Sequence, residues 1–132
     1  MKGLSARITR GLLLGSEVIV ADNSGAKIAR ITGVKGGKSR KGRQVGAGIA
    51  DLVKISVRKG LPEMKGVLFD AVIIRQRREW RRANGERICF ADNAVALLKD
   101  EKNPKGTMIR GAVAREVAER WPAVSKIAAA VI

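Results

Sequence analysis

The residue types that most often carry catalysis or bind metals are scarce in this sequence of 132 residues. Histidine is absent, and Cys89 is the only cysteine. Without an imidazole the chain has no nucleophile–histidine relay, and without a second cysteine it has neither a common zinc site nor an intramolecular disulfide. We therefore predict that the chain is not an enzyme and has no catalytic residues, no metal site and no cofactor.

Three short motifs resemble ligand-binding patterns, but none of them matches its pattern in full. Residues 32–39 match a phosphate-binding P-loop except that threonine replaces the first glycine, and more glycines follow where a helix is required. Residues 46–48 begin like a dinucleotide-binding fingerprint, but Asp51 occupies the position of the third glycine. Residues 22–25 supply a single carboxylate, so their Asp-Asn-Ser-Gly sequence favours a turn over a metal-binding loop.

Positive charge is the dominant feature of the composition. The chain has 27 Lys and Arg against 12 Asp and Glu, a net charge of +15. Such an excess repels itself unless a polyanion neutralises it, and the usual polyanions are nucleic acids and anionic membranes. No apolar run approaches the ~20 residues that span a bilayer, and Glu17 interrupts the only early one. We therefore predict a cytoplasmic protein that binds nucleic acid and has no membrane partner.

Two short blocks hold most of the excess charge. Residues 35–43 contain five Lys or Arg, three Gly and no acidic residue. This block has neither helical nor strand periodicity, so we predict a basic loop over residues 35–48. Residues 75–82 contain five Arg and one Glu. A solvated face that only aids solubility is the alternative, but solubility requires mixed signs and a modest net charge.

Aromatic residues are too few to read a series of single-stranded bases by stacking, since the chain has two Trp, two Phe and no Tyr. We expect Phe69 and Phe90 in the core. We expect Trp80 to pack against arginine stems, with stacking on a base as the alternative. Cys89 is most simply a small buried hydrophobic residue, with a reactive thiol as the minor alternative. Recognition is therefore predicted to use phosphates and the shape of a folded nucleic acid.

Short strands separated by turns are predicted along most of the chain. Residues 17–34 have the pattern of a hairpin, and residues 54–58 alternate between apolar and charged side chains. Residues 67–74 are nearly all apolar and predict a buried central strand. Asn-Gly at residues 84–85 is a hairpin signal, and residues 94–98 predict the last strand. Closure into a small barrel would remove the exposed edges of these strands.

The periodicity changes near the C-terminus. Val113, Val117 and Trp121 are spaced to lie on one face of a helix. Pro122 ends this run and can begin a second short helix that contains Val124. We therefore predict a short helical appendage after the barrel.

Several motifs, in this order, resemble the large-subunit ribosomal protein L14 family (uL14) over essentially the whole chain. They are residues 21–27 (Ala-Asp-Asn-Ser-Gly-Ala-Lys), residues 71–74 (Ala-Val-Ile-Ile), Asn84-Gly85 with the following Phe90, Asp92-Asn93 and Leu97, residues 104–107 (Pro-Lys-Gly-Thr) and residues 111–116 (Gly-Ala-Val-Ala-Arg-Glu). Ala96 departs from the pattern, since the family usually has valine there. The opening through Arg10 and the Trp121-Pro122 pair resemble the archaeal and eukaryotic branch.

This resemblance implies a mainly β fold, a small five-stranded closed β-barrel with a short C-terminal helical appendage. The chain would be a single L14-like domain over residues 1–132, with the barrel over about 1–110 and the appendage over about 111–132. Such a protein is a structural constituent of the large ribosomal subunit. It binds large-subunit rRNA and contributes to intersubunit bridges with small-subunit rRNA. A free-standing nucleic-acid-binding β-barrel outside the ribosome is the alternative.

The resemblance also implies partners and sites. Ribosomal proteins L3 and L24e would be neighbours, and an anti-association initiation factor would dock on the C-terminal portion. The predicted rRNA-binding residues are Lys35, Lys38, Arg40, Lys41, Arg43, Arg75, Arg77, Arg78, Arg81, Arg82, Lys105 and Arg110. The residues predicted at the intersubunit or factor surface are Arg115, Arg120 and Lys126.

Overall fold

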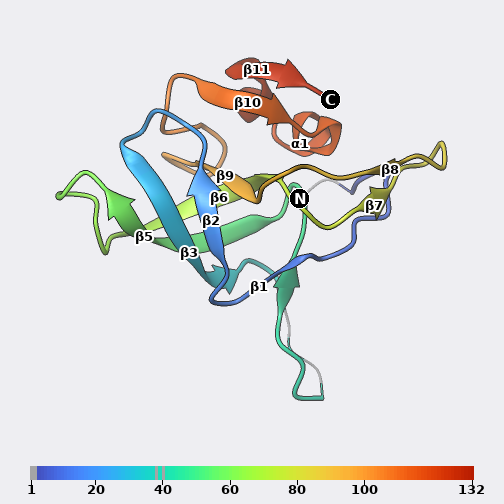
Figure 1. Cartoon of the computed structure of the whole chain (residues 1–132), viewed down its shortest axis with the longest axis horizontal. Helices are drawn as coiled ribbons and strands as arrows, with labels where there is room; N and C mark the ends of the chain where they lie inside the picture. Colours follow the sequence, from blue (N-terminus) through green and yellow to red (C-terminus); the bar gives the residue numbers. More distant parts are fainter. Residues whose placement is uncertain (1–2, 38, 40) are drawn as a thin grey trace.

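Short strands make up most of the structure, a computed structural model that describes residues 3–37, 39 and 41–132 (Figure 1). In chain order the elements are β1 (Leu12–Leu13), β2 (Glu17–Val20), β3 (Ala26–Val34), β4 (Gly46–Ala47), β5 (Leu52–Gly60), β6 (Leu68–Arg75), β7 (Trp80–Arg81), β8 (Arg87–Ile88), β9 (Ala94–Leu97), β10 (Ile109–Val113), α1 (Arg115–Arg120), α2 (Pro122–Lys126) and β11 (Ala128–Val131). Five of the strands close into a barrel in the order β2-β3-β5-β6-β9. The predicted five-stranded closed barrel is therefore confirmed.

The barrel closes where β2 pairs with β9. These two strands run parallel, whereas the other four neighbouring pairs of the barrel are antiparallel. The buried side chain of Asp22, which follows β2, stabilises the junction between β2 and β9. Its Oδ2 accepts a hydrogen bond from the backbone N–H of Leu97 at 2.9 Å, and its Oδ1 accepts from the hydroxyl of Ser24 at 2.6 Å. Residues 22–25 therefore form the turn that the sequence predicts.

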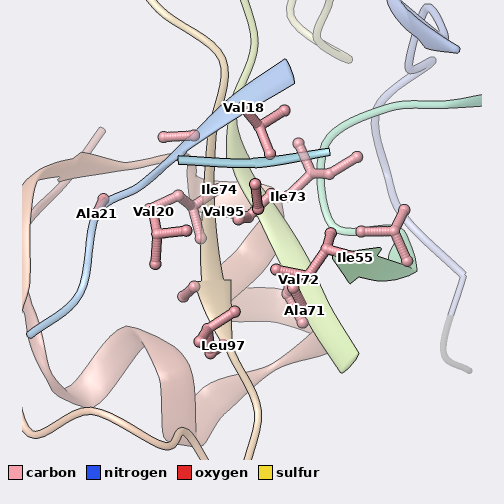
Figure 2. Packing of buried hydrophobic residues seen from close by; sticks show 14 of the residues in the cluster. Val18, Val20, Ala21, Ile55, Ala71, Val72, Ile73, Ile74, Val95 and Leu97 are labelled. Atoms are coloured by element: carbon pink, nitrogen blue, oxygen red, sulfur yellow. The ribbon is translucent and has the colours of Figure 1, made fainter. Parts of the chain in front are cut away.

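The barrel core is made of alternating apolar side chains. Ile55 of β5 is fully buried while its neighbour Lys54 is exposed, as the alternation predicts. Figure 2 shows apolar side chains of β2, β5, β6 and β9 meeting in the interior. Residues 71–74 of β6 are all buried, because the inner side of the strand faces the barrel while α1 and β10 contact the strand from outside.

The C-terminal segment has both predicted helices, but α1 begins only at Arg115, so the prediction that Val113 lies on the same helical face is wrong: Val113 ends β10. Val117 and Val124 are fully buried, and Pro122 begins α2. The side chain of Trp121 is also buried, and its Nε1–H donates to the carbonyl of Ala50 at 2.8 Å. This hydrogen bond fastens the appendage to the barrel. No helix in the described part of the chain is long and apolar enough to cross a membrane.

Two strands in this segment were not predicted from the sequence. β10 and β11 flank the helices and pair in parallel, so the expectation that residues 94–98 form the last strand is wrong. β11 has the sequence Ala-Ala-Ala-Val, which carries little strand propensity. It forms a strand because β10 lies beside it, and this pairing has no local signal in the sequence.

The side chains around Trp80 correct one prediction and confirm another. Trp80 is fully buried, its ring centroid lies 5.9 Å from that of Phe90, and the guanidinium of Arg82 lies 5.7 Å from the Trp80 ring. The prediction that Trp80 packs against arginine is confirmed. Cys89, predicted to be buried, is exposed. Its neighbours Ile88 and Phe90 are half-buried against the core, so alternation leaves Cys89 on the outer side.

Candidate nucleic-acid interface

An N-terminal arm, residues 3–11, brings cations that the sequence analysis did not select. The backbone N–H of Arg7 donates to the carbonyl of Arg81 at 3.1 Å, so the arm runs antiparallel beside β7 (Figure 1). At the other end of the arm, a Cβ on Gly11 would lie 2.5 Å from the Cβ of Arg78. Arg7 and Arg10 are both exposed. The arm therefore places these two arginines beside the arginine-rich block.

A signal for the arm is present in the sequence. Leu4, Ala6 and Ile8 are half-buried and pack against the core, while the residues between them are exposed. This is the alternation of an extended segment with one covered face. The run is only five residues long, so the sequence alone does not distinguish it from a loop.

Four exposed arginines, Arg7, Arg10, Arg78 and Arg81, form what we call the arginine surface. Two segments far apart in the chain contribute to it. Within the described residues, no ion pair to a carboxylate involves any of the four. A group of exposed guanidinium groups without acidic partners raises the local positive potential and attracts anions.

The basic loop begins where β3 ends and returns through β4, which lies inside the predicted range of residues 35–48. Its described part extends away from the barrel (Figure 1). Lys35, Lys41 and Arg43 are exposed. Lys38 and Arg40 lie outside the described residues. β4 pairs with β1, Leu12 opposite Ala47, so the base of the loop is joined to the N-terminal arm.

Arg75 and Arg82, both predicted to bind RNA, are engaged within the protein. Arg75 makes two hydrogen bonds to the carboxylate of Asp92, at 2.8 and 3.2 Å, and its Nη1 donates to the carbonyls of residues 110 and 112. Arg82 makes two hydrogen bonds to the carboxylate of Glu116, at 2.7 and 3.3 Å, and donates to the carbonyl of Ile132 at 2.7 Å. Both guanidinium groups therefore join the arginine-rich block to the C-terminal segment.

The other predicted RNA-binding residues are exposed but dispersed. Arg77 lies at a small hollow of about 260 Å³ beside β2, where its backbone N–H donates to Oδ1 of Asn93 at 2.8 Å. Lys105 lies over the ring of Phe69, with 5.2 Å from Nζ to the ring centroid. Arg110 is exposed on β10. None of these three belongs to the arginine surface.

A groove of about 770 Å³ lies between α2, the end of the barrel and residues 101–103. It is lined by Lys35, Leu52, Asp70, Leu98, Glu101, Lys102, Asn103, Arg120, Trp121, Pro122, Ala123 and Lys126. Arg120 in its wall donates to Oδ1 of Asp51 at 3.4 Å. The groove therefore joins two of the three residues predicted at the intersubunit or factor surface, while Arg115 is exposed at the start of α1 outside it.

The loop at this groove is ordered by Asp100. The side-chain amide of Asn103 and the backbone N–H groups of Asn103 and Lys102 donate to its carboxylate, which lowers the pKa of Asp100 from its ordinary value. Among the described residues, no group of three or more Cys, Asp or Glu could hold a metal ion.

The fold and this surface define a small, strongly basic β-barrel protein with a covering C-terminal segment. Comparison with known proteins gives the family. Residues 11–132 match the family model described as "Ribosomal protein L14p/L23e". The chain belongs to this family.

Individual relatives agree with this assignment. The chain is 56% identical over 133 residues to the large ribosomal subunit protein uL14 of Nanoarchaeum equitans, covering the whole of both chains. It is 47% identical over 132 residues to uL14 of Methanocorpusculum labreanum, again over both whole chains. It is 44% identical over 128 residues to uL14 of Methanococcus vannielii, over 97% of each chain. The resemblance inferred from the motifs is confirmed, and these relatives are archaeal.

Proposed function

We propose that this protein is a structural, non-catalytic constituent of the large ribosomal subunit, located in the ribosome in the cytoplasm, and that it binds large-subunit rRNA. The observation that carries the RNA-binding proposal is the arginine surface, where two adjacent segments carry four exposed arginines, none of which forms an ion pair within the described residues. Membership of a ribosomal protein family supports the location. The basic loop, with exposed Lys41 and Arg43, supplies a second set of cations.

The mode of binding follows from what the surface offers. Arginine donates hydrogen bonds in a planar fork that fits phosphate oxygens. Both tryptophans are buried in the core, and Trp121 has its indole N–H bonded to the barrel. Neither tryptophan can stack on an RNA base. Binding therefore uses phosphates and the shape of folded RNA.

The second part of the proposal concerns the C-terminal segment. The groove beside α2 carries Lys126 and Arg120 on an apolar floor that includes Trp121. The lining also includes the carboxylates of Asp70 and Glu101, and such a mixture of apolar side chains and both charges suits a protein partner as well as RNA. We propose that this region, with Arg115, faces small-subunit rRNA at an intersubunit bridge, adjoins ribosomal proteins L3 and L24e, and docks an anti-association initiation factor.

The RNA-binding proposal is tested by its salt dependence. Replacing Lys41, Arg43, Arg78 and Arg81 by alanine should reduce the slope of log Kd against log salt by about 3. Each phosphate contact that is lost leaves its counterions on the RNA, so fewer counterions are released on binding. The matched control removes the same charge from Lys27, Arg58, Lys59 and Lys65, which are exposed on β3, β5 and the turn after it. That turn lies at the side of the barrel opposite β7 and β8 (Figure 1).

The binding partner in this experiment is a transcript of large-subunit rRNA. An unchanged slope in the test variant, or an equal loss in the control, would refute the proposed surface. Sedimentation of the tagged protein in high-magnesium gradients tests the location. Recovery only in free fractions would favour a free-standing nucleic-acid-binding barrel.

A further inference from the structure

A buried amide connects the N-terminal arm, the arginine-rich block and the return from the basic loop, three segments that each carry exposed cations. The side chain of Gln76, at the end of β6, is 0% exposed. Its Nε2 donates to the carbonyl of Thr9 at 3.0 Å and to the carbonyl of Arg78 at 2.8 Å. Its Oε1 accepts from the backbone N–H of Ile49 at 3.2 Å. One side chain thus holds the N-terminal arm, the arginine-rich block and the return from the basic loop.

The chemistry of this position requires an amide. Two backbone carbonyls need donors and one backbone N–H needs an acceptor, and the side chain of glutamine supplies both kinds of group. A carboxylate of the same shape would lose both donors, and an apolar side chain would lose all three hydrogen bonds. The partners are buried or half-covered backbone groups, which are costly to leave unpaired.

The packing around Gln76 also holds the arm against the return from the basic loop. A Cβ on Gly48 would lie 2.5 Å from Cγ2 of Ile8 and 3.4 Å from Oε1 of Gln76. The arm therefore lies directly on the backbone of the loop return, with no room for a side chain between them. Elsewhere along the arm, the hydroxyl of Ser5 donates to the carboxylate of Glu119 at 3.2 Å, and this contact is at the surface.

Electrostatics oppose this arrangement before RNA binds. Arg7 pairs with Arg81 and Gly11 lies against Arg78, so the backbones that carry the four exposed arginines are adjacent, and like charges brought close repel. The apolar contacts of Leu4, Ala6 and Ile8 hold the arm against this repulsion, and the buried hydrogen bonds of Gln76 add to them. An arm that is ordered in the free protein does not have to be ordered on binding, which favours affinity.

We propose that Gln76 is a positioning residue for RNA binding, whose amide holds the N-terminal arm in place so that Arg7 and Arg10 contact phosphates together with Arg78 and Arg81. This inference rests on the proposed function. Gln76 itself does not touch RNA, because it is buried beneath the arm. Gln76 contributes by holding the arginines of the arm in position before RNA binds.

The test is a double-mutant cycle between Gln76 and the arm, with a transcript of large-subunit rRNA as the probe. In the unmodified protein, replacing Arg7 and Arg10 by alanine should lower the salt slope by about 1.5. Gln76→Met should lower it by a similar amount. In the Gln76→Met background, the arm substitutions should then change the affinity by less than about twofold, because coupled substitutions are not additive.

A second measurement follows the arm directly. Trypsin cleaves after Arg7 and Arg10, so release of the arm should increase the initial cleavage rate at these sites in Gln76→Met. The matched control is Val57→Ala, which leaves a cavity near the end of β5, next to the turn that lies opposite β7. It should lower the midpoint of unfolding while leaving the salt slope and the cleavage rate at the arm unchanged.

The outcomes distinguish failure of this inference from failure of the proposed function. Equal arm effects in both backgrounds would overturn the role of Gln76 while leaving the proposed function in place. No arm effect in the unmodified protein would remove Arg7 and Arg10 from the RNA contact and overturn the inference as well. The proposed function fails separately, through the four-residue variant described above. If Gln76→Met does not fold, Gln76→Glu keeps the shape and the acceptor, removes both donors and is judged by the same cycle.

Discussion

The ion pair between Arg82 and Glu116 gives the sharpest prediction about stability. The two side chains are 8% and 3% exposed, and two hydrogen bonds join them at 2.7 and 3.3 Å. Arg82→Met would leave the carboxylate of Glu116 buried without its partner. Removing one member of a buried pair costs about 3–5 kcal/mol. With a urea m-value of about 2 kcal/mol/M, this shifts the unfolding midpoint down by about 2 M.

Removing both charges should restore most of the loss. In the double variant Arg82→Met with Glu116→Leu, apolar side chains of similar volume replace the pair, and such replacements are often neutral or stabilising. The carbonyl of Ile132 still accepts from the backbone N–H of Arg115 at 3.0 Å. We expect the double variant to lie within about 1–2 kcal/mol of the unmodified protein.

An exposed pair provides the control. Arg87 and Glu79 lie 3.3 Å apart with side chains 60% and 55% exposed. Arg87→Met should cost less than about 1 kcal/mol, because water screens such a pair. Urea unfolding followed by circular dichroism, at low and at high salt, measures all the variants. A cost for Arg82→Met no greater than that for Arg87→Met, or a double variant no more stable than the single one, would refute the reasoning.

The same double variant separates two roles for Arg82. If its guanidinium serves only to join the arginine-rich block to the C-terminal segment, the salt slope of rRNA binding should not change. A slope reduced by about 1 would show that Arg82 contacts a phosphate. This result would move Arg82 back into the RNA-binding set that the sequence predicts.

Two further substitutions test the junctions of the fold by the same unfolding assay. Asp22→Ala removes the acceptor for the N–H of Leu97 and should cost about 2–3 kcal/mol, since a buried donor is left unpaired; a cost below about 0.5 kcal/mol would contradict the role of this turn in closing the barrel. Trp121→Phe removes the hydrogen bond to Ala50 but keeps the buried ring, so it should cost about 1 kcal/mol. A much larger loss would indicate that ring packing at this position is the main contribution.

Sequence patterns predicted the parts of the fold whose conformation depends on residues close by in the chain. The turn at residues 22–25, the alternation around Ile55 and the helix around Val117 were all found in the structure, although the helix begins after Val113. In each case neighbours within a few residues decide the conformation, so the pattern is visible without knowledge of the rest of the chain.

The features that were missed depend on distant partners. The five arginines of residues 75–82 are alike in sequence, but two of them have carboxylate partners that lie 17 and 34 residues further along the chain. Nothing near Arg75 or Arg82 distinguishes them from Arg78 and Arg81. The parallel pairing of β10 with β11 is hidden for the same reason.

The parallel pairing of β2 with β9 also sets an order of events during synthesis. The hydrogen bond from Leu97 to Asp22 joins residues 75 positions apart. Ribosomes add about 5–20 residues each second, so β2 waits for roughly 4–15 s before its partner has been made. In that interval the nascent sheet has an open edge, and self-repulsion of a highly cationic chain discourages pairing with other copies. The barrel can close only after synthesis has passed Leu97.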